Sequence, residues 1–282
     1  MKTDRILYII IILTIIPFPT FSNVDMEMQA GFGNYHKPGH WIFLRNILTN
    51  SGSKIDGELM VNTRESSVNA RKNFTLPLVI PSYDIEIEDI YLKPEGFRHN
   101  LKVYLNNKDK EEIISREAAL KVIPEDDILI LVLGNDPDNL DFLTKTDTSN
   151  QENPDIHIVY SAFINDRISE ILPGIWKGYD SVDVVIIGDV LLQEVSLNQQ
   201  QALIDWVSAG GNLIISGGIN SRNLMGEHIE KILPVKLNGE TFLLDQDALQ
   251  EAFDSESIMG QLILAESTPV TEARIIISDA KT

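Results

Sequence analysis

Residues 182–216 read VDVVIIGDVLLQEVSLNQQQALIDWVSAGGNLIIS, and this stretch decides the fold predicted for the second half of the chain. It opens with the largely apolar run 182–187, which has the length of a short strand. Ser196 and Gln199 then form a capping box, and apolar side chains follow it at helical spacing. Residues 212–216 form a second apolar run. The order strand, crossover helix, strand predicts a parallel sheet.

Two more apolar runs upstream extend this sheet. Residues 128–133, ILILVL, form a continuous apolar run, as expected of a parallel strand that is buried on both faces. Residues 156–160 supply another short strand. Because the composition changes at Pro124, we expect an α/β domain with a parallel sheet over residues 124–222.

Residues 223–282 are less regular and predict a partial α+β extension of this domain. Residues 235–237 and 241–244 predict a hairpin, because Asn238-Gly239 between them is a favoured turn. The extension is either an insertion in the α/β domain or an incomplete continuation of it.

Residues 23–123 alternate short apolar stretches with turn residues and predict an antiparallel, immunoglobulin-like β-sandwich. Residues 24–28 alternate strictly between apolar and polar, as a half-buried strand does. Later apolar stretches recur about every ten residues with turns between them, which is typical of sandwich strands. Pro77 and Pro81 place one of these strands at a sheet edge, where a missing backbone donor is tolerated.

His36 and His40 flank Lys37-Pro38-Gly39 in this first half. A spacing of four residues suits a shared metal only on a helix, and Pro-Gly prevents a helix here. No carboxylate lies nearby in the sequence, so we interpret both histidines as structural. The sequence predicts no metal site and no cofactor.

Residues 1–22 have the three parts of a secretory signal peptide. Lys2 and Arg5 precede the apolar run 6–16, and Thr20 and Ser22 are small residues suited to cleavage after Ser22. The run has about half of the roughly 20 residues that a membrane-spanning helix needs. The alternative is an uncleaved amino-terminal anchor. Both readings place the rest of the chain outside the cytoplasm, in a periplasmic or other extracytoplasmic space.

The 282-residue chain contains no cysteine, which excludes disulfides, thiolate metal sites and a cysteine nucleophile. Its 42 acidic and 23 basic side chains give a net charge of −19. Nearly all of this charge lies in residues 124–282, which hold 27 acidic and 8 basic groups, whereas residues 23–123 hold 14 and 13. An acidic balance of this size repels the phosphate backbone and argues against nucleic-acid binding.

A longer pattern comprises LPGIWKGY at 172–179, VDVVII at 182–187, QQALIDWV at 200–207 and GGNLIISGG at 210–218. This pattern resembles the class I glutamine amidotransferase-like superfamily, whose domain is flavodoxin-like. Together with AGFGNYHKPGHWIFLRNILTNSG at 30–52, it resembles more narrowly a group of exported bacterial proteins. These proteins place the flavodoxin-like domain behind an amino-terminal β-sandwich. The resemblance covers most of residues 24–222.

This resemblance does not imply catalysis. Active amidotransferases use a cysteine on a tight strand-to-helix turn, with a histidine and a glutamate, and this chain has no cysteine for that role. An alternative is a hydrolase with Ser216 as nucleophile, because Ser216 ends a strand at the edge where open α/β sheets bind ligands. Against it, residues 214–218 lack the first glycine of the Gly-x-Ser-x-Gly turn.

The same sheet edge supplies candidate ligand-binding residues. Asp189 follows a strand end and is a candidate for a cation or a polar ligand. Ser216, Gly217 and Gly218 are a loose match to a loop whose backbone donors bind an anion.

We therefore expect a non-catalytic, exported cell-envelope protein that acts by binding or scaffolding, with an envelope protein or glycan as its partner. A glycan-binding module is a further alternative, in which Trp176 and Tyr179 stack against sugar rings. In the resembling proteins a transmembrane helix and a cytoplasmic tail usually follow, whereas this chain stops at Thr282. A truncated product, a part of a longer protein and a secreted variant all agree with this. Membrane association would come from such a helix or from an uncleaved amino-terminal segment.

Overall fold

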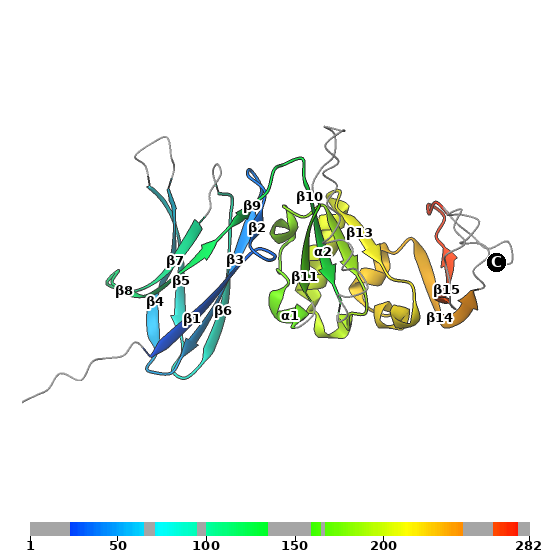
Figure 1. Cartoon of the computed structure of the whole chain (residues 1–282). Helices are drawn as coiled ribbons and strands as arrows, with labels where there is room; N and C mark the ends of the chain where they lie inside the picture. The colour runs from blue at the N-terminus through cyan, green and yellow to red at the C-terminus, as the bar shows by residue number, and fades with distance from the viewer. Residues whose placement is uncertain are drawn as a thin grey trace, which may run out of the picture.

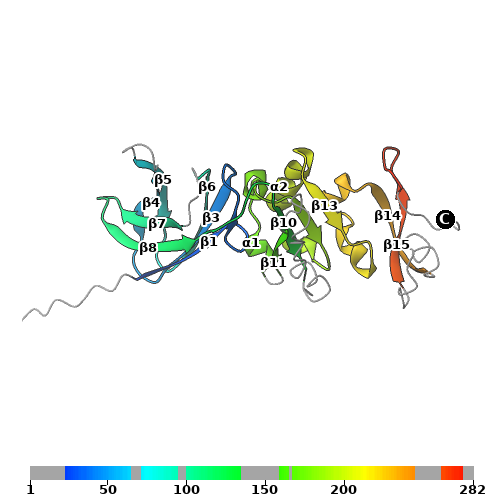
Figure 2. The ribbon, with the colours of Figure 1, turned by 45° about the horizontal axis from the view of Figure 1, so that its top comes forward.

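The computed structural model describes residues 23–64, 71–94, 100–134, 159–164, 167–244 and 262–275. Three parts lie in a row: a sandwich (residues 24–122), a parallel-sheet unit (residues 128–232) and a two-stranded ribbon (residues 235–269) (Figures 1 and 2). Within the described ranges, no helix combines the length and the apolar character that crossing a membrane requires. The predicted signal peptide lies outside the described residues.

Two antiparallel sheets form the sandwich. Their strands are β1 (Val24–Ala30), β3 (Ile42–Asn50), β4 (Ile55–Arg64), β5 (Arg71–Ile80), β6 (Ile85–Leu92), β7 (Asn100–Asn107) and β8 (Glu112–Ala119). One sheet has the order β1-β3-β6 and the other the order β5-β4-β7-β8. Alternating apolar residues of both sheets, among them Met26, Leu44 and Leu59, fill the core between them.

A β-rich, sandwich-like fold is therefore confirmed for the first part. Pro77 lies in β5, and β5 is an end strand of its sheet, as the prolines predict. A short parallel pair, β2 (Tyr35–His36) with β9 (Lys121–Val122), leads from the sandwich to the next part.

The parallel-sheet unit contains β10 (Ile128–Leu133), β11 (Val159–Ile164), β12 (Val184–Ile187) and β13 (Asn212–Ile215). Their order is β11-β10-β12-β13, and every neighbouring pair is parallel. The helix α2 (Leu197–Ser208) connects β12 to β13. It begins after Ser196, where the predicted capping box with Gln199 is present on both sides.

The prediction of a flavodoxin-like α/β domain is wrong. In the described residues α2 is the only α-helix longer than one turn, so the helical layers of such a domain are not found. The other helices are α1 (Ile168–Ile171) and the 3₁₀ segments η2 (Trp176–Tyr179), η3 (Leu192–Glu194), η4 (Ile219–Leu224) and η5 (His228–Ile232). Pro173 explains why α1 is short, because the residue before a proline is held extended and Leu172 has ψ 137°. The described chain is mostly β.

The ribbon pairs β14 (Val235–Leu244) with β15 (Leu262–Pro269) in antiparallel fashion. The predicted hairpin around Asn238-Gly239 is wrong, because β14 runs through both residues. Gly239 has φ +82° and interrupts the register between Leu237 and Thr241. A β-bulge uses the left-handed freedom of glycine as a tight turn does, so the sequence motif is the same in both cases.

One hydrophobic core continues from the sandwich into the parallel-sheet unit. Phe32 and Phe43 come from the sandwich, and their ring centroids lie 5.2 Å apart. The ring of Tyr179 lies 5.5 Å from Phe32 on one side and 5.9 Å from Trp206 of α2 on the other. The two parts therefore pack as one body and are not separate domains on a loose linker.

Candidate functional site

The carboxyl ends of β10, β12 and β13 bring three residues together at one sheet edge. The strand register aligns the last residues of these strands, so Gly134, Asp189 and Ser216 follow adjacent strand ends. The Ser216 N–H donates to the Ile187 carbonyl at 2.9 Å. The Asp189 carboxylate lies over Gly134, where a methyl carbon on the glycine would be 3.2 Å from Oδ1. The structure thus places two predicted site residues, Asp189 and Ser216, at neighbouring strand ends, with the Asp189 carboxylate on the side of Gly134.

Gly217 and Gly218 contact the ribbon at this edge. The Gly217 carbonyl accepts a hydrogen bond from the Ala265 N–H at 2.6 Å. A methyl carbon on Gly218 would lie 3.5 Å from the carbonyl oxygen of Ile263. These contacts attach β15 to the end of β13, but they do not require glycine, since a methyl carbon on Gly217 would meet nothing within 4 Å. The anion-binding role of both glycines stays a prediction.

Ser216 is exposed, and no hydrogen bond joins its hydroxyl to a histidine or carboxylate among the described side chains. A nucleophilic serine needs a base within hydrogen-bond reach, so the described geometry offers the hydrolase alternative no support. The described part of the chain also holds no group of three or more histidine, aspartate and glutamate side chains suited to a metal ion.

Trp176 and Tyr179 lie apart from this edge, in η2, which packs against α2 and β3. Tyr179 is completely buried, so the prediction that its ring stacks on a glycan is wrong. Trp176 is half-buried against the same core. The apolar spacing of Leu172, Tyr179 and Val182 is the sequence pattern that indicates burial here, and all three belong to the core.

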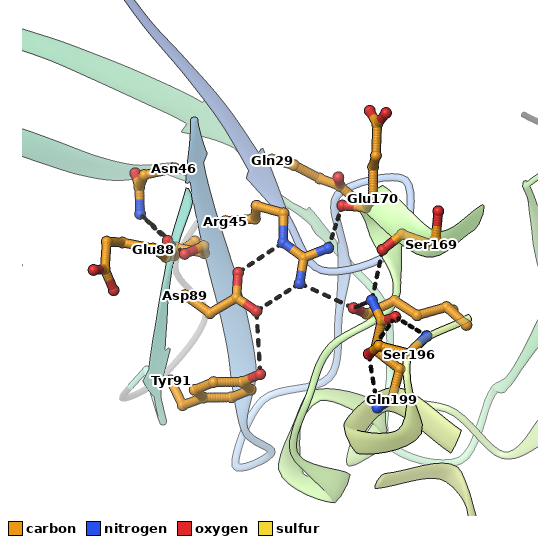
Figure 3. Close-up of polar contacts among 12 residues, drawn as sticks. Gln29, Arg45, Asn46, Glu88, Asp89, Tyr91, Ser169, Glu170, Ser196 and Gln199 are labelled. Atoms are coloured by element: carbon orange, nitrogen blue, oxygen red, sulfur yellow. Dashed lines mark hydrogen bonds and ion pairs between the residues drawn. The ribbon is translucent and has the colours of Figure 1, made fainter. Parts of the chain in front are cut away.

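Arg45 of β3 joins the sandwich to the parallel-sheet unit (Figure 3). Within its own sheet the guanidinium pairs with Asp89 of β6 through two contacts, Nε to Oδ1 at 2.7 Å and Nη2 to Oδ2 at 2.6 Å. Across the junction, Nη1 donates to the Glu170 carbonyl and Nη2 donates to the Leu172 carbonyl. The Arg45 and Asp89 side chains are 7% and 17% exposed, so the pair is shielded from water.

The carbonyls that Arg45 binds belong to the end of α1, where a helix leaves its last carbonyls without partners inside the helix. Gln199 of α2 binds the same region, because its Nε2 donates to the carbonyls of Ser169 at 2.6 Å and Leu172 at 2.7 Å. Its Oε1 accepts the Ser196 N–H in the capping box. One glutamine thus attaches α1 to α2, and one arginine attaches α1 to the sandwich.

Two tyrosines beside this junction remain protonated. Tyr91 of β6 donates its hydroxyl to Asp89 at 3.3 Å. Burial raises the pKa of Tyr91, and the Asp89 charge adds to the shift. Burial likewise raises the pKa of Tyr179, whose hydroxyl has no hydrogen-bond partner within the described structure.

A second set of contacts lies at the amino ends of β10 and β12. The buried Lys37 places its Nζ 2.7 Å from Oδ2 of Asp183 and 3.3 Å from the Glu125 carbonyl. Asp183 also accepts the Leu129 N–H at 2.7 Å. Lys37 comes from the sandwich and Asp183 from the parallel-sheet unit, so this ion pair fixes the junction at the opposite end of the strands.

His40 lies beside two carboxylates that the sequence did not reveal. Its Nε2 is 2.8 Å from Oε1 of Glu125, and its Nδ1 is 2.7 Å from the Asp180 carbonyl oxygen. The Asp180 carboxylate accepts the Trp41 N–H at 2.8 Å. These partners are 85 and 140 positions away from His40 in the chain, and no local pattern announces them. The contacts agree with the structural interpretation of the histidine.

His36, in β2, is completely buried, and neither of its ring nitrogens has a hydrogen-bond partner in the described structure. Burial lowers the pKa of His36 from its ordinary 6.5 to about 4, and neighbouring His40 adds to the shift. The folded protein therefore holds this imidazole neutral at the point where the sandwich leads into the second part.

This burial predicts a pH dependence of stability. The unfolded chain binds a proton at His36 below pH 6.5, whereas the folded chain does so only below about pH 4. The contribution of neutral His36 to the free energy of unfolding is complete above pH 6.5. It is lost as the pH falls towards 4, and the total loss is about 3 kcal/mol. Urea unfolding of the wild type and of His36→Phe between pH 7.5 and 4.5 measures it. A difference between the two proteins that does not change with pH would contradict this assignment.

Comparison with known proteins gives one family match and weak structural likenesses. Residues 23–121 match a family described as a domain of unknown function (DUF8726). No curated protein matches the chain. The family match covers only the sandwich, so the amidotransferase-like resemblance of the second half stays a prediction.

Three solved structures illustrate how weak the structural likenesses are. One is the alkylpurine DNA glycosylase AlkC of Pseudomonas fluorescens, at 13% identity and TM-score 0.27, covering 35% of this chain and 30% of that one. Another is the sporulation control protein Spo0M of Bacillus subtilis, at 11% identity and TM-score 0.25. The likeness covers 37% of this chain and 50% of that one. The third is a calcium binding mutant of β-glucuronidase 2 from Bacteroides uniformis, at 10% identity and TM-score 0.29. The likeness covers 76% of this chain and 35% of that one. The chain spans at most half of each of these proteins, and likenesses at this level define neither its fold nor its function.

Proposed function

We propose that the protein acts by binding, as a rigid two-part scaffold of the cell envelope, and not by catalysis. The observation that carries the proposal is the junction of Arg45 with Asp89 and the carbonyls of α1. Burying a charged pair is costly, and this pair is also bonded to both parts, so it favours one arrangement of them. A scaffold needs one arrangement, because its binding surfaces must keep fixed positions relative to one another.

Two further features support the proposal. Residues 1–22 have the pattern of an export signal, which directs the rest of the chain to an extracytoplasmic space. The excess of acidic residues in 124–282 gives the second half a surface suited to a basic partner. The charged side chains of the junction form two ion pairs, Arg45 with Asp89 and Lys37 with Asp183, as in a structural connection.

The proposal is tested on the full chain expressed in a bacterium with its amino-terminal segment intact. We expect the mature protein in the extracytoplasmic fraction, with an amino terminus at Asn23 by mass spectrometry. We also expect the purified protein to show the same background as the double variant Asp189→Asn, Ser216→Ala towards amide, peptide and ester substrates. The double variant changes the strand-end residues and leaves the junction intact.

Two results would contradict the proposal. Turnover that the double variant abolishes would establish an enzyme at the sheet edge. A chain that stays in the cytoplasm with residues 1–22 attached would remove the export component.

A further inference from the structure

The edge strand β6 presents backbone groups on its outer side that no described strand pairs with. In the order β1-β3-β6 it is the end strand, and none of the described strands pairs with its other edge. The Asn50 N–H donates to the Asp84 carbonyl at 2.9 Å, so the backbone N–H and C=O groups of even-numbered residues in β3 point towards β6. In β6, the even-numbered residues likewise direct their backbone groups to β3. Because antiparallel ladders alternate, the backbone groups of Ile85, Ile87 and Asp89 point to the free edge. The Ile85 N–H donates to Oδ1 of Asp84 at 2.8 Å, so the donors of this edge are the N–H groups of Ile87 and Asp89.

Exposed apolar side chains follow the same edge. Ile85 and Ile87 are 57% and 50% exposed on the outer face of the sheet. Tyr83, in the turn before β6, is 81% exposed and has φ +57°. A left-handed backbone at a bulky residue costs about 1–2 kcal/mol, so the chain holds this aromatic ring in solvent at an energetic cost. An exposed tyrosine at the end of an isoleucine row is typical of a binding surface.

The first half of β6 is acidic on its inward-facing side, whereas Ile90 and Leu92 further along belong to the core. Glu86 and Glu88 alternate with the two isoleucines and point to the rim of the sandwich. Burial raises the pKa of Glu88, and the charges of Glu86 and Asp89 add to the shift, so negative charge is crowded here. The three strands of this sheet hold five acidic residues and one basic residue, and that basic residue, Arg45, is occupied by Asp89.

These charges decide what can occupy the edge. A second copy pairing through β6 would place glutamates against glutamates, in a chain whose net charge is already −19. Inward-pointing charges on an edge strand prevent such self-pairing. A cationic segment would instead neutralise Glu86 and Glu88.

We propose that the β6 edge binds an extended segment of a partner protein in which basic and apolar residues alternate. The segment adds as a fourth strand to the sheet, so that its basic side chains face Glu86 and Glu88 and its apolar side chains extend the row of Ile85 and Ile87. The other end of this outer face, at Arg45, is already covered by the parallel-sheet unit, so the edge continues an interface that the protein itself uses. This inference rests on the proposed binding function and names the partner's chemistry.

The test uses a fluorescein-labelled peptide of alternating lysine and valine, with the 8-residue length of β6, titrated with the full protein. We expect the double variant Glu86→Lys, Glu88→Lys to raise the peptide Kd by about tenfold or more. The matched control is Glu117→Lys on β8, the end strand of the other sheet, which changes the Kd by less than about twofold. The double variant should in turn bind a glutamate–valine peptide, a gain that an unfolded protein would not show.

Two peptide controls test the geometry of binding. A peptide of the same composition with its lysines and valines in separate blocks is expected to bind at least about tenfold more weakly. Its lysines and valines would no longer lie on opposite faces of the added strand. N-methylation of alternate residues on one edge of the peptide removes its strand donors and should abolish binding. Equal binding by either control peptide, or by the Glu86→Lys, Glu88→Lys protein, would overturn the inference. Such results leave the export and activity measurements unaffected, so failure here is distinct from failure of the proposed function.

Discussion

Replacing Arg45 with methionine is expected to lower the free energy of unfolding by about 3–5 kcal/mol. Methionine keeps much of the volume of the arginine stem but leaves the Asp89 carboxylate nearly buried without its partner. The carbonyls of Glu170 and Leu172 also lose a charged donor. Leaving a buried charge uncompensated is the main part of the cost, and the lost hydrogen bonds add to it.

Urea unfolding followed by tryptophan fluorescence measures this effect, since Trp41, Trp176 and Trp206 all lie in the residues around the junction. The matched control is Arg116→Met, which removes an ion pair with Asp25 whose side chains are 43% and 68% exposed. An exposed pair contributes at most about 1 kcal/mol. Equal losses in both variants would show that the Arg45 pair is not shielded from water.

A double-mutant cycle separates the pair from the carbonyl contacts. Adding Asp89→Asn to Arg45→Met removes the uncompensated charge, so the double variant should recover part of the stability lost in the single variant. The part that is not recovered reports on the carbonyls at the end of α1. No recovery would assign the whole effect to those carbonyls and not to the ion pair.

The sequence predicts local features well where one short pattern determines them. The strict alternation of residues 24–28 predicts β1, and the apolar run 128–133 coincides with β10. Ser196 and Gln199 predict the start of α2, because a capping box satisfies helix donors within four residues. In each case the physical cause lies inside the segment itself.

Predictions that depended on distant parts of the chain were less successful. The flavodoxin-like domain is what the resemblance of residues 172–218 implies, whereas Pro173 confines α1 to a single turn. Asn238-Gly239 specifies a left-handed backbone, but it does not specify whether the chain reverses or continues through a bulge.

The junction could not be predicted because its partners are distant in the chain. Arg45 binds Asp89 at a separation of 44 residues and the carbonyls of Glu170 and Leu172 at 125 and 127. Carbonyl acceptors have no sequence signature, since every residue carries one. At the sheet edge, parallel strands align their carboxyl ends, so Asp189 and Ser216 could be grouped in advance.

Replacing Tyr179 with alanine is expected to lower the free energy of unfolding by about 3–5 kcal/mol. Its ring lies between Phe32 of the sandwich and Trp206 of α2, and neither neighbour can move to fill the space without disturbing its own part. The cavity would lie within the core that the two parts share. Their unfolding should then no longer be a single transition, so that the midpoints measured by tryptophan fluorescence and by far-ultraviolet circular dichroism do not coincide.

Tyr179→Phe distinguishes this loss of packing from a role of the hydroxyl. The hydroxyl is buried and has no hydrogen-bond partner among the described residues, so its removal takes away a desolvated polar group and no bond. Phenylalanine keeps both ring contacts, and we expect its stability to lie within about 1 kcal/mol of the wild type, or above it. A large loss in Tyr179→Phe would mean that the hydroxyl is bonded in solution, for example to an internal water. A small loss in Tyr179→Ala would mean that the sandwich and the parallel-sheet unit do not depend on a shared core, and the rigid connection on which the scaffold function rests would then be wrong.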